Sequence, residues 1–279
     1  MDARTFLGLE ATDDPLRYRL PLRRELFTPG EFLFGGCGLG AAVEAAEWAT
    51  GRPMIWATAQ YLGYATGDGV LDVIVEPLVV GKGTTQARVR VVKADGSEVL
   101  GVQAALGSRP SGTDGQWAER PDVPGPNHTR PRTSRRGFAG MQGTIMDTME
   151  IRQAVGRGWD DLGDGTSGDG RSSLWVRMVG GRRLPTSGDL AMAGDHVPSG
   201  IGHALGMVAG GNSLDNTIRV ARLVETEWIL VDIRLHAIAD GFGHGTAHLW
   251  AEDGTLLGSA SQSCIVRVFP DGPPRLASS

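Results

Sequence analysis

Val70-Leu-Asp-Val-Ile-Val-Glu76 opens a pattern that this chain uses twice. It is followed by the glycine-bearing turn Gly81-Lys-Gly83, apolar alternation over residues 84–93, the turn Ala94-Asp-Gly96, and the run Val99-Leu-Gly-Val-Gln103. An Asp-Gly pair between alternating apolar runs is a strong hairpin signal, because such turns need residues that tolerate positive φ. The block therefore predicts three antiparallel strands.

The same order returns in residues 228–267. Trp228-Ile-Leu-Val-Asp-Ile-Arg-Leu-His236 reads as the first strand, and Gly241-Phe-Gly-His-Gly245 as the turn after it. The later turns of the two blocks also match, because Asp253-Gly254-Thr255 and Asp95-Gly96-Ser97 each lead after a short apolar step into Leu-Gly. This repetition predicts a duplicated domain.

A Gly- and Ala-rich segment that can form a helix precedes each block. Residues 38–50 show the clearer helical spacing, and Gly51-Arg-Pro53 predicts the end of that helix. Residues 190–210 are the equivalent segment, and Pro198 predicts a shorter and less regular helix there. Each copy is therefore expected to combine an antiparallel sheet with one main helix, which makes the chain an α+β protein.

The connector between the copies is rich in Pro, Gly and Arg and lacks apolar periodicity. We expect a first domain over residues 15–110, a linker over 111–144 and a second domain over 145–268 that carries the catalytic residues. The copies should meet in a continuous sheet or a shared groove, with the functional site near the seam.

The composition is that of a globular protein with a sizeable core. The 279 residues are 41% hydrophobic and 21% charged, and the net charge of −5 argues against nucleic acid as a partner. No apolar run approaches the length of a membrane span, so no membrane partner is expected, and the N-terminus lacks a long apolar core. Two cysteines, Cys37 and Cys264, fit a reducing compartment, which predicts a cytoplasmic protein.

Four segments resemble signatures of acyl-CoA thioesterase II and its thioesterase-like relatives. They are Phe34-Gly-Gly-Cys-Gly-Leu-Gly-Ala-Ala42, Leu190-Ala-Met-Ala-Gly-Asp195, Ser213-Leu-Asp215 and Ser259-Ala-Ser-Gln262, and the resemblance spans roughly residues 25–267. It implies a tandem double hotdog fold, in which each antiparallel sheet wraps around a central helix. It also implies an acyl-CoA hydrolase of fatty acid metabolism that uses no cofactor. Self-association into a homo-oligomer is implied as well, and an exposed sheet face and sheet edges favour it independently.

The resemblance assigns catalysis to Asp195, Ser213 and Gln262 in the second copy. Thioester hydrolysis needs no covalent nucleophile if a carboxylate and two neutral groups hold a water beside the carbonyl. Each residue also has a structural interpretation: Asp195 as a helix cap, Ser213 at a strand edge and Gln262 at a solvated strand position. After Asp215 the chain departs from the family, with Asn-Thr-Ile-Arg219 where His and aromatic residues are usual, so a different acyl preference is expected.

Substrate binding is assigned to Gly36 and Gly38, at the start of the first helix, and to Tyr61. Free N–H groups at such a start can bind an anion or the thioester oxygen, although tight helix–sheet packing explains the glycines equally well. Cys37 has no neighbouring base in the sequence and is read as a small buried residue. The run Arg130-Pro-Arg-Thr-Ser-Arg-Arg136 can meet coenzyme A phosphates, but a solvated linker is the favoured interpretation.

Other chemistries find less support. His244 and His248 share one face of a predicted strand, but no third ligand stands at a persuasive spacing, so no metal site is predicted. The glycines of residues 35–40 lack the βαβ context of a dinucleotide site, and no Gly-x-Ser-x-Gly elbow occurs.

Two alternatives stay open. A hotdog hydratase or dehydratase needs an Asp-x-x-Pro-x-His pattern, which Asp195-His-Val-Pro198 begins, but Gly200 stands at the His position. His196 and His203 remain nearby. The other alternative is a non-catalytic protein that binds acyl ligands.

Overall fold

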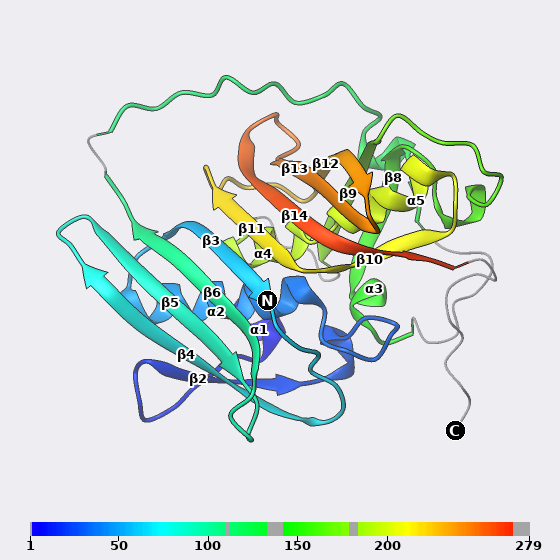
Figure 1. The fold of residues 1–279 in the computed structure, drawn as a ribbon. Helices are drawn as coiled ribbons and strands as arrows, with labels where there is room; N and C mark the ends of the chain where they lie inside the picture. The colour runs from blue at the N-terminus through cyan, green and yellow to red at the C-terminus, as the bar shows by residue number, and fades with distance from the viewer. Residues whose placement is uncertain (1, 110–111, 133–141, 179–183, 270–279) are drawn as a thin grey trace.

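One antiparallel sheet dominates the computed structural model, which describes residues 2–109, 112–132, 142–178 and 184–269 (Figure 1). Its strands run in the order β1-β2-β4-β5-β6-β3-β11-β14-β13-β12-β9-β8-β7, and β10 pairs with β14 beside β11. The strands of the first half are β1 Glu10–Ala11, β2 Arg17–Leu22, β3 Met54–Tyr61, β4 Gly69–Val80, β5 Thr84–Val92 and β6 Glu98–Gly107. Those of the second half are β7 Arg130–Pro131, β8 Met149–Val155, β9 Arg171–Met178, β10 Ala209–Ser213, β11 Asp215–Val220, β12 Ile229–Ala239, β13 Phe242–Trp250 and β14 Leu256–Val268.

The helices lie against the sheet. The main ones are α2 Gly35–Thr50 in the first half and, in the second, α4 Ser187–Gly194 and α5 Gly200–Leu205, separated by the 3-10 turn Val197–Ser199. The shorter ones are α1 Ala3–Leu7, α3 Ile145–Thr148 and the 3-10 turns Arg24–Leu26, Pro126–His128 and Trp159–Asp161. Among the described helices none is long and apolar enough to cross a membrane.

The two predicted Asp-Gly turns both form. Gly96 between β5 and β6 has φ +84°, and Gly254 between β13 and β14 has φ +93°. Only the glycine of each pair takes positive φ, because each aspartate instead accepts a backbone N–H two residues on: Ser97 N to Asp95 Oδ1 at 2.9 Å, and Thr255 N to Asp253 Oδ1 at 2.8 Å. The duplicated hairpins thus form in the same way. With the helices packed on this sheet, the predicted α+β double hotdog fold is confirmed.

The two halves meet along β3 and β11, which lie side by side in the middle of the sheet (Figure 1). The side chains of Thr58 and Thr217 join across this seam, with their Oγ1 atoms 3.0 Å apart. The sheet is therefore continuous through both halves. The assignment of domain limits to residues 15–110 and 145–268 stays a prediction.

Helices α2 and α4 pack directly against each other across the seam. A Cβ on Gly40 would lie 3.2 Å from the carbonyl oxygen of Gly188, so the absence of a side chain on α2 permits this approach. The buried Glu44 accepts the N–H of Gly188 at 3.3 Å, and Glu47 accepts Ser187 Oγ at 2.8 Å. Carboxylates of α2 thus satisfy donors at the start of α4.

Helix boundaries differ from the sequence prediction in two places. Helix α2 begins at Gly35, three residues before the predicted start, so the first glycines form its opening turn. The expected helix over residues 190–210 is divided, because Pro198 occupies a 3-10 turn between α4 and α5. Asp195 consequently follows the end of α4 as its C-cap residue.

Candidate active site

Asp195 follows the last turn of α4, and its side chain points at the start of α2. Its Oδ2 accepts the backbone N–H of Gly36 at 2.6 Å. That N–H is one of the donors that the first turn of a helix leaves without an intrahelical partner. The carboxylate of the second half is therefore held by the helix of the first half.

Ser213 and Gln262 hold the other oxygen of Asp195. Ser213 Oγ, at the end of β10, lies 3.4 Å from Oδ1, and the Nε2 group of Gln262 on β14 donates to the same oxygen. Gln262 Nε2 is also 3.1 Å from Ser213 Oγ. The N–H of Val197 donates to Gln262 Oε1 at 3.2 Å, which fixes the amide with its NH₂ toward the carboxylate. The structure thus brings the three residues predicted to be catalytic into one hydrogen-bonded group.

Burial controls the protonation of Asp195. Removal of the carboxylate from water raises its pKa to about 7, against the partly opposing effect of hydrogen bonds from Gln262, Gly36 and Ser213. Desolvation disfavours a charge, while donors aimed at the carboxylate favour it. Asp195 is consequently a carboxyl group that changes charge close to neutral pH, where a general base works best.

Tyr61 ends β3 on the other side of the same point. A Cβ on Gly35 would lie 2.8 Å from Asp195 Oδ2 and 2.9 Å from the Tyr61 hydroxyl, so both groups converge on the backbone of Gly35. The hydroxyl is buried, and it interacts with the side chain of Asn216 on β11 without the geometry of an ordinary hydrogen bond. Burial, reinforced by the charge of Asp195, raises the pKa of Tyr61 and keeps it a proton donor.

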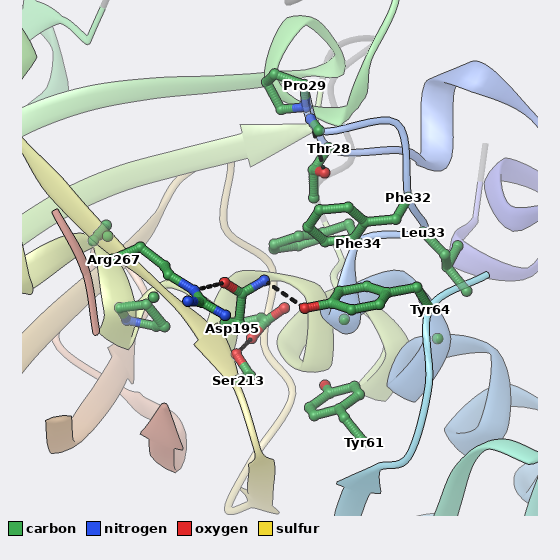
Figure 2. Close-up of a pocket in the computed structure, with 18 of the residues that line it drawn as sticks. Thr28, Pro29, Phe32, Leu33, Phe34, Tyr61, Tyr64, Asp195, Ser213 and Arg267 are labelled. Atoms are coloured by element: carbon green, nitrogen blue, oxygen red, sulfur yellow. Dashed lines mark hydrogen bonds between the residues drawn. The ribbon is translucent and has the colours of Figure 1, made fainter. Parts of the chain in front are cut away.

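A cavity of about 740 Å³ opens in front of this group (Figure 2). Asp195, Ser213, Tyr61 and Gly38 are on its wall. The rest of the lining is largely apolar and includes Pro29, Phe32, Leu33, Phe34, Met146, Ile151 and Trp159. Gly36 and Gln262 are not among the lining residues. The cavity thus joins an apolar chamber to a buried carboxylate.

Asn212 connects two polar side chains on this wall. Its amide donates to the Tyr64 hydroxyl at 3.1 Å and its oxygen accepts Arg267 Nε at 3.0 Å, as the dashed lines of Figure 2 show. Both Tyr64 and Arg267 are exposed. Polar, solvent-accessible groups therefore mark the opening of the cavity.

His196 was weighed in the sequence only for a hydratase, and the structure places it on the cavity wall. Its Nδ1 donates to the carbonyl oxygen of Ala193 at 3.0 Å, which fixes the tautomer. Burial, with the charge of Arg132 as the second cause, lowers the pKa of His196 to about 4, so the ring is neutral at pH 7.

Several other sequence interpretations can be compared with the structure. Cys37 is buried against Met192, with 3.9 Å between the sulfur atoms, and burial raises the pKa of its thiol, which does not suit a nucleophile. His244 bonds Ser263, and the described residues hold no group of three or more metal-binding side chains.

The interpretation of residues 130–136 as a solvated linker is wrong for Arg132. Arg130 begins the short strand β7, and Arg132 lines the cavity. Residues 135 and 136 lie outside the described part of the chain. A charged side chain in a proline-rich connector carries no local signal of burial, so the sequence did not reveal this placement.

The chain is similar to known thioesterases in sequence and in structure. A model of the acyl-CoA thioesterase C-terminal domain family matches residues 119–266, which is more than half of the chain. A structure of a putative thioesterase from Novosphingobium aromaticivorans is 31% identical, with a TM-score of 0.80 over 92% of this chain and 97% of that one.

More distant structures share the fold. A tesB protein from Mycobacterium avium is 17% identical, with a TM-score of 0.73 over 96% of this chain and 98% of that one. An acyl-CoA thioesterase II from Mycobacterium marinum is 18% identical, with a TM-score of 0.72 over 96% and 98%. No curated protein sequence matches significantly. From the extent of the family match and the identity to the Novosphingobium structure, we conclude that this chain belongs to the acyl-CoA thioesterase family.

Proposed function

We propose that the protein hydrolyses acyl-CoA to the free acid and coenzyme A with a water molecule activated by Asp195. The observation that carries the proposal is a carboxyl group of pKa about 7 on the wall of an apolar cavity. Gly36, Ser213 and Gln262 donate three hydrogen bonds to it. A carboxylate has about four acceptor positions, so one position, on Oδ2, is left for water.

Asp195 acts as general base in the proposed step. It accepts a proton while the water oxygen bonds to the thioester carbon, the C–S bond then breaks, and the departing thiolate takes up that proton. Ser213 and Gln262 fix the carboxylate, and its fixed position orients the water on Oδ2. Tyr61, whose burial keeps the hydroxyl protonated, donates to the carbonyl oxygen as negative charge develops there.

The glycines have separate roles in this proposal. Gly36 supports Asp195, because its N–H is already bonded to the carboxylate. Gly38 lines the cavity, and a Cβ there would come within 2.8 Å of Leu100, so the absence of a side chain lets α2 pack closely against Leu100 on the cavity wall.

Thiol release from a panel of acyl-CoA substrates tests the reaction. Asp195→Asn should lower kcat by about 10²- to 10⁴-fold, the usual loss of general-base assistance, while Ser213→Ala and Gln262→Ala should cost less. Asp215→Asn is the matched control, because its carboxylate accepts the Ser263 N–H at 2.7 Å and an amide oxygen can do the same. Full turnover by Asp195→Asn would refute the mechanism.

The same assay separates the alternatives. Loss of enoyl absorbance without thiol release would identify a hydratase, and tight acyl-CoA binding without turnover would identify a binding protein. Tyr61→Phe should lower kcat more than it raises KM if the hydroxyl acts mainly on the developing oxyanion.

We further propose that the protein acts in the cytoplasm on acyl groups of fatty acid metabolism, as a homo-oligomer. Two buried cysteines that form no disulfide suit a reducing compartment, and the outer face of the sheet offers a surface for a second copy. Light scattering that shows only a 29.5 kDa monomer at micromolar concentration would contradict the oligomer.

A further inference from the structure

Arg132 occupies an unusual place for a charged residue. It follows strand β7, its backbone N–H bonds to the carbonyl oxygen of Ile151 at 2.7 Å, and its side chain lines the same cavity as Asp195. The guanidinium carbon lies 5.6 Å from the centre of the Trp159 ring. The positive group is therefore held against an aromatic wall of the acyl chamber.

No carboxylate pairs with this guanidinium among the described residues. Its Nε is buried and has no hydrogen-bond partner there. The segments outside the described ranges contain a single acidic side chain, Asp271. Burial lowers the pKa of Arg132 to about 10, which still leaves it charged at neutral pH.

Arg132 is half-buried, and its Nε is withdrawn from water. A cation withdrawn from water without a counter-ion is costly, and buried charges in proteins are normally paired. The partly buried Arg177, by contrast, pairs with Glu150 at 2.8 Å. An arginine that faces a ligand cavity without a carboxylate is accounted for if the ligand brings the anion. Its planar fork of donors suits a carboxylate, which it can bind through two hydrogen bonds.

The position of His196 shows that Arg132 lies near the proposed reaction centre. It follows Asp195 in the chain and lines the cavity, and it lies close enough to Arg132 for that charge to affect its ring. An anion bound by Arg132 would therefore be near the scissile thioester.

We propose that Arg132 binds a carboxylate at the distal end of the acyl group, so that the preferred substrates are CoA thioesters of short dicarboxylic acids. This proposal rests on the proposed function and specifies its substrate class. The phosphates of coenzyme A are another anionic source. They are assigned to the exposed Arg267 at the opening, because a solvated nucleotide does not need a buried partner.

Kinetics with matched acyl chains test the proposal. Glutaryl-CoA is compared with pentanoyl-CoA, and adipyl-CoA with hexanoyl-CoA, in the wild type and in Arg132→Met. We expect the wild type to prefer the dicarboxylic member of each pair, and Arg132→Met to lower that preference by about 10- to 100-fold, the usual effect of losing a charge-assisted hydrogen bond. Arg132→Lys keeps the charge but not the planar fork of donors. Its preference for the dicarboxylic substrate should lie between that of the wild type and that of Arg132→Met.

One further substrate and two further variants test whether a different anion pairs with Arg132. If Arg132 binds coenzyme A phosphates, Arg132→Met will raise KM equally for every acyl-CoA and will have no effect on glutaryl-pantetheine, which overturns the proposal. Arg267→Met should change KM for both members of a pair alike. If Asp271 is the true partner of Arg132, Asp271→Asn will reproduce the effect of Arg132→Met, and the proposal fails.

Binding measured without turnover distinguishes failure of this proposal from failure of the proposed function. In the Asp195→Asn background, calorimetry should show tighter binding of glutaryl-CoA than of pentanoyl-CoA, and Arg132→Met should remove the difference. Equal binding of the two ligands before Arg132 is changed overturns the substrate assignment, whatever the hydrolysis assays show. Thermal melting of each variant checks that it is folded.

Discussion

Asp195→Asn should stabilise the protein in a pH-dependent manner while it inactivates the enzyme. The carboxyl pKa is about 7 in the folded protein, against an ordinary value of 3.8. Between these values the folded protein keeps a proton that the unfolded chain releases. The stability of the wild type is therefore greatest below the unfolded pKa and decreases as the pH rises toward the folded pKa.

The size of the effect follows from the pKa shift. Each unit of pKa corresponds to about 1.4 kcal/mol, so the penalty for ionising the buried group reaches roughly 4 kcal/mol above pH 7. Between pH 5 and pH 8 the wild type should lose about 3 kcal/mol that Asp195→Asn does not lose. In Asp195→Asn the new NH₂ group also faces one of the donors from Gly36 or Gln262. The lost hydrogen bond lowers the stability of the variant by an amount that does not depend on pH.

Urea unfolding of both proteins at pH 5 and pH 8 measures this difference. Asp253→Asn changes a carboxylate in the exposed turn between β13 and β14. It is the control for the effects of buffer and net charge on the free energy of unfolding. If the gap in unfolding free energy between Asp195→Asn and the wild type is the same at the two pH values, Asp195 is not a buried carboxyl of raised pKa. The general-base argument would then lose its physical basis.

Two further predictions concern the same carboxylate. The kcat/KM of the wild type should rise with pH through about 7 and then level off, because only the ionised form of Asp195 accepts a proton; a profile that falls over this range would contradict the assigned role. Gly36→Ala should lower kcat at least tenfold in thiol-release assays, because its new methyl group would lie 2.9 Å from Met192 Cα and 3.0 Å from Asp195 Cβ and must displace them. Gly69→Ala, whose methyl group meets only Leu22 at 4.0 Å, is the control, and equal effects of the two changes would rule out a specific role for the contact at Asp195.

The fold was predictable because its signals are local. The turns at Gly96 and Gly254 lie in short alternating segments, and their hairpins set the order of neighbouring strands. Helix boundaries were less accurate. The start of α2 at Gly35 depends on packing against α4. The residues of α4 lie far along the chain and do not appear in the sequence around Gly35.

The candidate site was only partly predictable. Family segments identified Asp195, Ser213 and Gln262, and the structure brings them together. Two features had no sequence signal. The bond from Gly36 to Asp195 joins residues far apart in the chain, and Arg132 gives no sign in its proline-rich surroundings that it faces the cavity.

The continuous sheet also limits how the protein can meet other chains. Among the described strands, the two outermost are β1 and β7, and each has only two residues. A strand of that length offers too few unpaired backbone groups to template the addition of a foreign strand, a common route to aggregation. Joining the halves through β3 and β11 buries the edges that two separate sheets would have exposed there. At the two ends of the sheet, contact with another chain must therefore use side chains, where sequence can specify the partner.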